Sequence, residues 1–152
     1  MMSPVRVMIM GLAQFFMFLA LQTAMAQPQE TELPENLFRG FELYKAEGPR
    51  AALEKWVEGG PLEGRQDLTG QANALRTVQD FYGPYVTHHI VAVRALANST
   101  KFIYVLIDHE NGPLFCKFTA FKGSEGWHIV NFDFNTDAEE IWPESLLQPE
   151  TP

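Results

Sequence analysis

Three turn-forming sequences divide residues 85–135 into four segments, and this pattern constrains the fold more than any other feature of the chain. The segments are rich in Val, Ile, Phe, Tyr and Thr, residues that favour strands. They cover residues 85–96, 101–108, 114–122 and 127–135. The turns between them are Asn98-Ser99, Asn111-Gly112 and the Gly-Ser-Glu-Gly sequence at 123–126, all typical of hairpins. Three consecutive hairpins predict a four-stranded antiparallel meander.

Helical periodicity precedes the strands. A first helix begins at Pro34 and ends at Gly48, and a second begins at Pro49 and ends at Gly59-Gly60. Their apolar faces hold Leu37, Phe41 and Tyr44 in the first and Ala52, Leu53, Trp56 and Val57 in the second. A third helix begins near Asp67 or Thr69, either of which could cap it, and ends at Gly83-Pro84.

A short helix carrying Ile141 and Trp142 is expected after the last strand, because Thr136–Glu139 matches a capping box. The predicted fold class is therefore α+β, with three N-terminal helices packed on a curved four-stranded antiparallel meander and a short C-terminal helix. We expect one domain over residues 34–142 and a C-terminal tail over 143–152.

The N-terminus has the features of a secretory signal. One positive charge, Arg6, precedes an apolar run at 7–21, and the segment ends in Ala24-Met25-Ala26. Cleavage before Gln27 would remove residues 1–26 and leave 27–33 as a flexible tail. The alternative is an uncleaved membrane anchor, but the apolar run is shorter than the roughly 20 residues that span a bilayer. We therefore expect an exported protein, periplasmic or secreted, with no membrane span after cleavage.

Charge and cysteine content exclude some classes of function. The chain carries a net charge of −8, and losing Arg6 would make it −9. Such acidity argues against binding nucleic acid or anionic lipid, which requires clustered Lys and Arg. The single cysteine, Cys116, excludes an internal disulfide. Its position in mid-strand, without neighbouring cations, favours a core residue over a nucleophile.

Both faces of the predicted sheet are apolar, although an antiparallel sheet with one wet face should alternate. With a two-residue turn at Asn111-Gly112, one face holds Phe102, Tyr104, Leu106, Phe115, Phe121, Val130 and Phe132. The other holds Ile103, Val105, Ile107, Cys116, Phe118, Ala120 and Ile129. Three helices cover one face only. The second face must meet another chain, enclose a cavity or be covered by the C-terminal segment, and a homodimer through the sheet is the simplest of these.

The last hairpin, Gly126-Trp127-His128-Ile129-Val130, follows the Phe-rich strand at 114–121. With helices first and a curved meander after them, residues 34–142 resemble the nuclear-transport-factor-2-like (NTF2-like) superfamily of cone-shaped α+β domains. The resemblance implies either isomerase-like or dehydratase-like chemistry or a non-catalytic binding or accessory role. Enzymatic members usually place a short strand before the third helix, and residues 59–66 are too short and Gly-rich to assign one.

Two groups of side chains are candidates for acid–base chemistry. In one register of the first hairpin His88 faces His109 and His89 faces Asp108. The first pair could bind a metal if a carboxylate joined them, and the second could act as an acid–base pair. Alternatively, Asp80, Asp108 or Asp133 with Tyr82 or Tyr104 could supply a base and a hydrogen-bond donor. Strand-end histidines are more often structural, so we assign no metal site and no cofactor.

The candidate ligand-binding residues are the aromatic side chains Tyr82, Tyr104, Phe118, Trp127 and Trp142. Trp142 is the candidate lid over the open sheet face. The favoured function is a non-catalytic binding or accessory domain whose apolar sheet face accepts a small apolar ligand or a protein partner. The alternatives are a small pocket enzyme and a structural or inhibitory domain that acts through its surface.

Overall fold

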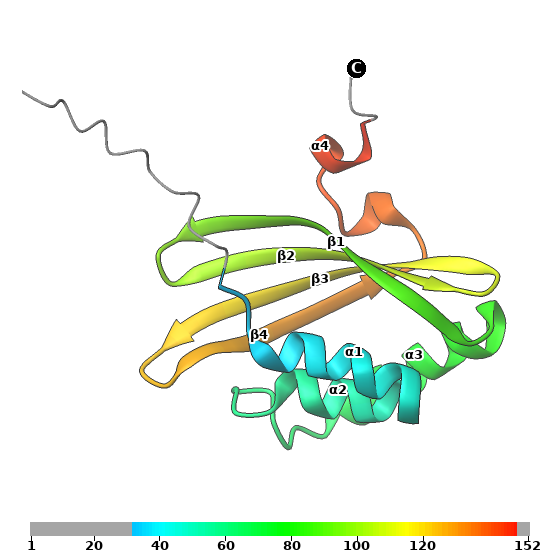
Figure 1. Ribbon diagram of the computed structural model, residues 1–152, viewed down its shortest axis with the longest axis horizontal. Coiled ribbons are helices and arrows are strands. Elements are labelled where there is room, and N and C mark those ends of the chain that lie inside the picture. The colour runs from blue at the N-terminus through cyan, green and yellow to red at the C-terminus, as the bar shows by residue number, and fades with distance from the viewer. Residues whose placement is uncertain (1–31, 149–152) are drawn as a thin grey trace, which may run out of the picture.

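The computed structural model describes residues 32–148, which form helices on one side of an antiparallel sheet. The elements are α1 (Glu35–Glu47), α2 (Pro49–Val57), α3 (Asp67–Tyr82), β1 (Tyr85–Ala97), β2 (Thr100–His109), β3 (Gly112–Gly123), β4 (Gly126–Asn135), a 3₁₀ turn (Ala138–Glu140) and α4 (Glu144–Leu147). The strand order is β1-β2-β3-β4. Figure 1 shows α1, α2 and α3 on one side of the sheet and the C-terminal segment on the other. The predicted α+β class and meander are confirmed.

Helices α1 and α2 pack closely because Gly40 leaves room for an indole. A Cβ atom on Gly40 would lie 2.0 Å from Nε1 of Trp56. The Trp56 Nε1–H donates to the carbonyl of Leu37 at 3.0 Å, which fixes the ring against α1. Gly48 joins the helices at φ 97°, a conformation that favours glycine. The predicted hairpin of two short helices is therefore correct.

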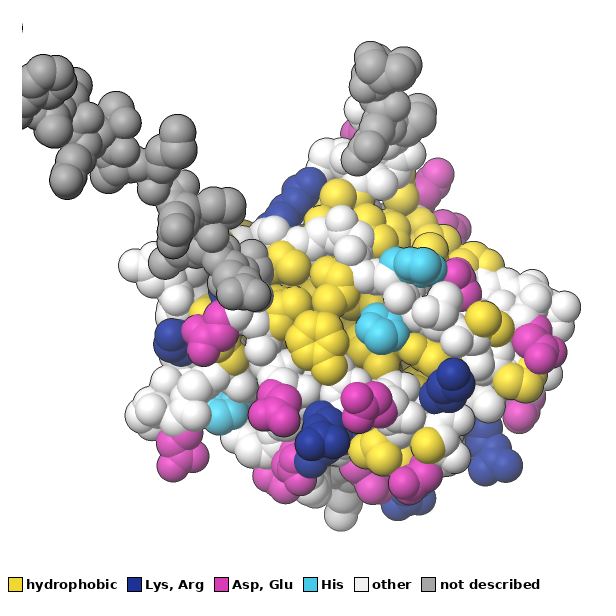
Figure 2. Space-filling view, viewed as in Figure 1, with side chains coloured by type: hydrophobic (Ala, Val, Ile, Leu, Met, Phe, Trp, Pro, Cys, Tyr) yellow, Lys and Arg dark blue, Asp and Glu magenta, His cyan; other side chains and the backbone are white. Residues whose placement is uncertain are grey.

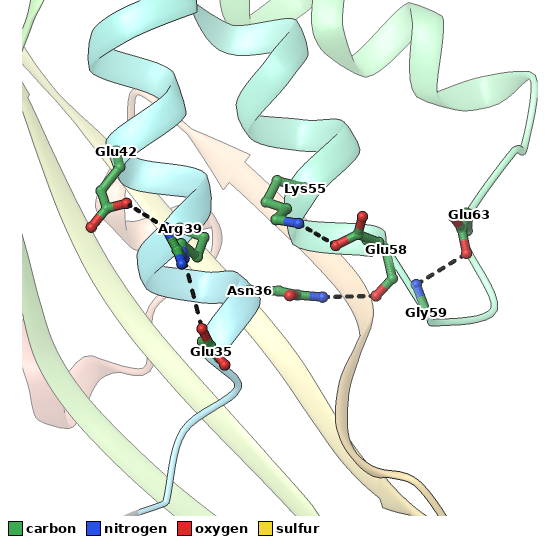
Figure 3. Close-up of polar contacts among 8 residues, drawn as sticks. All are labelled: Glu35, Asn36, Arg39, Glu42, Lys55, Glu58, Gly59 and Glu63. Carbon is green, nitrogen blue, oxygen red and sulfur yellow. Dashed lines mark hydrogen bonds and ion pairs between the residues drawn. The ribbon is translucent and has the colours of Figure 1, made fainter.

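Polar contacts connect exposed residues of the helical hairpin formed by α1 and α2 (Figure 3). Arg39 lies 3.7 Å from both Glu35 and Glu42, and Lys55 pairs with Glu58. The Asn36 side chain donates to the Glu58 carbonyl at 2.8 Å, which connects α1 to the end of α2. Exposed ion pairs of this kind contribute less than about 1 kcal/mol each, so the hairpin depends on its buried face.

The core lies between the helices and the sheet. Its largest fully buried side chains are Trp56, Tyr44, Phe41, Phe118, Leu37, Leu53, Leu75, Ile103, Ile107, Leu114, Ile129 and Val57. Trp56 contacts Phe118 and Phe132 with ring centroids 5.1 Å apart in each case. Cys116 is also fully buried there, as predicted. Burial raises the pKa of its thiol well above the usual value, which disfavours the nucleophilic thiolate.

Bulges in β1 overturn the register proposed for the two histidines. Ala97 pairs with Thr100 at the turn, as that register requires, but shifts follow between Ala95 and Ala97 and between Ile90 and Ala92. Each shift slips the pairing by one residue. His88 therefore pairs with Ile107 instead of His109, and His89 pairs with Leu106 instead of Asp108. Because the total slip at His88 and His89 is two residues, these two side chains keep their predicted faces.

The turn between β2 and β3 also differs from expectation. His109 pairs with Gly112, so the two turn residues are Glu110 and Asn111 rather than Asn111-Gly112. The end of α3 explains the shift: the Asn111 N–H donates to the Tyr82 carbonyl at 2.8 Å. The Tyr82 ring lies so close to Gly112 that a Cβ there would be 2.3 Å from it. Tertiary packing has therefore displaced the local turn preference.

A further bulge, in β4, moves the side chains after it to the opposite face of the sheet from the one predicted. Ala120 pairs with Ile129 and Thr119 with Asn131, so Val130 is the extra residue. The prediction placed Phe132 on the same face as Phe115 and Phe121, and this is wrong. Phe132 instead pairs with Phe118 on the helix side and is 2% exposed.

The C-terminal segment is ordered further than predicted. Asp137, not Thr136, caps the turn at Ala138–Glu140 by accepting from the Glu139 N–H at 3.0 Å. Helix α4 lies within the segment predicted as a tail, and Arg94 donates to the Ser145 hydroxyl at 2.7 Å. The predicted signal peptide at 1–26 and parts of both predicted tails, 27–31 and 149–152, lie outside the described residues. Within residues 32–148 no helix combines the length and apolarity needed to cross a membrane.

Candidate functional site

Two tyrosine–histidine pairs lie side by side where α1 packs on β1 and β2. The Tyr44 hydroxyl lies 3.3 Å from His109 Nε2, and the Tyr85 hydroxyl lies 2.7 Å from His88 Nδ1. The Tyr44 and Tyr85 ring centroids are 5.2 Å apart, and Phe41 stacks on His88 at 3.9 Å. Helical spacing along α1 aims Phe41 and Tyr44 at the same strip of the sheet.

Burial disfavours the charged form of all four groups. It raises the pKa of Tyr85 to about 12 and that of Tyr44 further. It lowers the pKa of His88, helped by the charge of His89. It also lowers the pKa of His109, although the Asp108 carboxylate opposes this shift. Each phenol is paired with a neutral imidazole, so the cluster is suited to tying α1 to the sheet rather than to moving protons.

An apolar surface lies beside this cluster. Figure 2 shows hydrophobic side chains gathered above the helices, with histidine side chains next to them. Phe38 of α1 is 42% exposed and Val91, the bulge residue of β1, is 41% exposed. The interior behind them is filled by the buried aromatic side chains.

The opposite, outer face of the sheet carries the predicted acid–base pair. His89 Nε2 lies 3.0 Å from Asp108 Oδ2, although the two residues are diagonal neighbours instead of directly paired. Diagonal neighbours on one face remain within reach of long side chains. Their side chains are 56% and 39% exposed. The pair is formed as the sequence predicted, but in an open, solvated position.

The other candidate carboxylate, Asp133, is engaged by a cation. Its Oδ2 lies 3.1 Å from Lys117 Nζ and accepts from the Asn131 side chain at 2.9 Å. Neither predicted phenol makes a hydrogen bond to it within residues 32–148. Tyr82 lies against Gly112 at the end of α3. Within residues 32–148, Asp133 is therefore paired with a lysine and an asparagine rather than with a predicted phenol.

Trp142 lies on the outer face, where it was predicted as a lid. Its ring centroid is 5.0 Å from Phe115 and 6.5 Å from Tyr104, and its Nε1–H donates to the Cys116 carbonyl at 3.1 Å. Arg94 lies 6.0 Å above the Tyr104 ring and holds Ser145. The C-terminal segment therefore covers part of the second apolar face, and Tyr104 and Trp142 are the predicted ligand residues that the fold brings together.

The remaining predicted ligand residues are dispersed. Phe118 is fully buried in the core. Trp127 lies near the hairpin tip between β3 and β4, where its Nε1–H donates to the Glu32 carboxylate at 3.2 Å. The Lys101 ammonium lies 4.0 Å above its ring. These contacts lower the pKa of Glu32, mainly through the Trp127 and Lys122 hydrogen bonds.

Sequence reasoning missed Tyr44 and Tyr85 as partners of the histidines. In the sequence, Tyr44 occupies a position on the apolar face of a predicted helix, and 65 residues separate it from His109. Only the packing of α1 across β1 brings them together, and no local signal in the sequence indicates it.

A broad hollow of about 830 Å³ opens between α2 and the segment leading to α3. Charged side chains including Arg50, Glu54, Glu63 and Arg65 rim it. Leu53 and Val57 at its base are each only 1% exposed, so it offers little apolar contact. None of the predicted site residues lines it.

Comparison with known proteins assigns no function to this chain. No protein-family model and no curated protein matches the chain. Among solved structures, an NTF-2-like protein of unknown function from Silicibacter pomeroyi DSS-3 is similar, with 18% sequence identity and a TM-score of 0.44. The match covers 65% of this chain and 88% of that one. The described residues themselves form an α+β domain, with helices followed by an open antiparallel meander.

Proposed function

We propose that this chain is a non-catalytic binding domain, exported from the cytoplasm, that pairs with a second copy of itself through the outer face of its sheet. The observation that carries the proposal is the apolar surface that the C-terminal segment leaves uncovered. Phe121 is 44% exposed on this face, and Phe102 and Leu106 are only partly buried. Monomeric proteins rarely leave contiguous apolar patches exposed without a role.

The size of the face fits a dimer. Four strands about 4.8 Å apart and about ten residues long cover roughly 600 Å² in projection. A stable interface buries about 800 Å² per partner, so the sheet with its C-terminal segment supplies an area of the right order.

The charge of the face supports a second copy as the occupant. The chain as a whole carries −8 and would repel a copy of itself. The outer face instead carries both signs, with Arg94 and Lys117 beside Asp108 and Asp133. A two-fold axis brings the same patch of both copies together, so a face with both signs can complement itself.

The test is molar mass by sedimentation equilibrium over a range of concentrations, combined with native mass spectrometry. We expect a dimer that Phe121→Ser dissociates. Phe81→Ser is the matched control, because Phe81 is 79% exposed but lies on α3. A monomer at all concentrations, or a dimer that survives Phe121→Ser, would refute the proposal. A retained non-covalent mass on a monomer would point instead to a small apolar ligand.

A second candidate is acid–base catalysis by His89 and Asp108, favoured by their 3.0 Å hydrogen bond. A carboxylate that accepts a hydrogen bond from an imidazole fixes the tautomer and orientation of the ring. The assay is isomerisation of a β,γ-unsaturated ketone by the full chain. Loss of turnover in His89→Gln but not in His128→Gln would support catalysis, whereas no turnover in the parent protein would exclude this reaction.

A further inference from the structure

The edge of β4 is the feature of the fold that remains without a role. The strand lies at one end of the sheet and pairs only with β3. Within residues 32–148, no backbone hydrogen bond outside the sheet involves residues 126–135. The other edge strand, β1, is interrupted by three register shifts, which weaken an edge as a template for pairing. Strand β4 has one shift, and Asn131–Asn135 pairs regularly beyond it.

Neighbouring segments enclose this edge without pairing with it. At one end, Gly60 approaches β4 so closely that a Cβ there would lie 2.8 Å from the Ile129 carbonyl oxygen. Beyond that point a hollow of about 430 Å³ follows the strand. It is lined by Gln71 of α3, Lys117 of β3, residues 132–134 of β4, and Glu140 and Ile141 of the C-terminal segment. Because these residues come from both sides of the sheet, the hollow is a slot along its edge.

Gln71, which lines the slot, carries an unsatisfied polar group. The side-chain oxygen of Gln71 is buried and accepts no hydrogen bond within the described residues. An amide of this kind rotates readily about its last torsion, so it could turn to accept from an incoming N–H. A buried acceptor without a donor is unfavourable, so a partner that supplies a donor there is stabilised.

We propose that this slot binds an extended, basic segment of a partner polypeptide, which adds as a fifth strand to β4. Main-chain hydrogen bonds to the free edge would supply affinity, as in other strand-addition complexes. The regular stretch Asn131–Asn135 offers about 16 Å of edge, enough for a five-residue strand.

The charges of the residues that line the slot indicate which kind of segment would bind there. Lys117 is neutralised by Asp133, whereas Glu140 has no ion-pair partner within residues 32–148. The slot is therefore acidic and lies on a chain of net charge −8. The chain's own end sequences fit poorly: 27–33 contains Glu30 and Glu32, and 149–152 is Pro-Glu-Thr-Pro, which can donate few backbone hydrogen bonds. A basic segment of another protein is the complementary occupant.

The test uses the full chain, immobilised, and a display library of random peptides of about nine residues, long enough to extend past the edge at both ends. We expect selected peptides to contain Lys or Arg among β-branched residues. Binding should raise the hydrogen-exchange protection of Asn131–Asn135 amides about tenfold or more. Glu140→Lys should weaken binding about tenfold. Glu139→Lys, one residue away and outside the slot, should change it less than about twofold.

Three results would overturn the proposal: no enriched peptide, protection confined to another surface, or equal weakening by the two lysine variants. Phe121→Ser separates this proposal from the dimer. It lies on the outer face and not in the slot, so it should dissociate a dimer and leave peptide binding unchanged.

Discussion

Replacing Gly40 by alanine tests whether the contact between α1 and α2 determines the stability of the domain. A heavy-atom contact to carbon is comfortable at about 3.5–4.0 Å. The added Cβ would lie 2.0 Å from Trp56 Nε1, so the ring or the helix must move by about 1.5 Å. The ring has little freedom, because Trp56 is fully buried and donates to the Leu37 carbonyl.

Two effects of opposite sign decide the magnitude. Alanine is favoured over glycine inside a helix by about 1 kcal/mol. Overpacking a close contact costs about 3 kcal/mol or more when backbone must shift. The net expectation for Gly40→Ala is a loss of about 2 kcal/mol. With a urea m-value of about 2 kcal/mol/M, the unfolding midpoint should fall by about 1 M.

Gly70→Ala is the matched control. Gly70 is also helical, in α3, but it is exposed and an added Cβ would have no neighbour within 4 Å. Only the helix propensity of alanine over glycine applies at Gly70, so the free energy of unfolding should rise by about 1 kcal/mol. Urea unfolding followed by tryptophan fluorescence and circular dichroism measures both variants. If Gly40→Ala stabilises the protein as Gly70→Ala does, the close packing of Trp56 on α1 is refuted.

Three further predictions concern the buried polar cluster and the C-terminal segment. Tyr44→Phe removes the hydroxyl that pairs with His109 and should lower the free energy of unfolding by about 1–2 kcal/mol, measured by urea unfolding. Burial lowers the pKa of His88 and His109 in the folded state, so the unfolded chain takes up protons first as the pH falls below 6.5. Stability should therefore decline as the pH falls below about 6.5, and His109→Asn should reduce this decline. Trp142→Ala should cost about 3 kcal/mol and increase binding of an apolar dye, whereas Leu147→Ala, at the rim of the same segment, should change stability by less than about 0.5 kcal/mol.

The sequence was sufficient to predict the helices and strands and their order along the chain. The helix ends are determined by the backbone conformations of Gly48, Pro49 and Gly83. Because these preferences depend only on the residues themselves, they can be predicted from the sequence. The strands were equally predictable from the sequence, and their observed bounds lie within two residues of the predicted ones.

Register and site geometry were less predictable, because they depend on non-local packing. Nothing in the residues around Val91 marks it as a bulge, yet that bulge and the one near Leu96 together shift the pairing of His89 by two residues. The Tyr44–His109 contact requires α1 to lie across two strands. The His89–Asp108 pair was found correctly because a two-residue slip preserves the face.

The extra residue at Val130 explains why Asp133 lies on the outer face of the sheet. With the bulge, Ile129 and Phe132 both point into the core. The side chains after Phe132 then alternate between the outer face and the helix side of the sheet. Asp133 therefore faces outward, where it meets Lys117. Without the bulge, Asp133 would face the helices, and a carboxylate buried there would lose hydration that no nearby cation replaces. On the helix side, the hydroxyls of Tyr44 and Tyr85 are paired with histidine nitrogens. The bulge thus places the Asp133 carboxylate on the outer face and in the slot along the edge of β4.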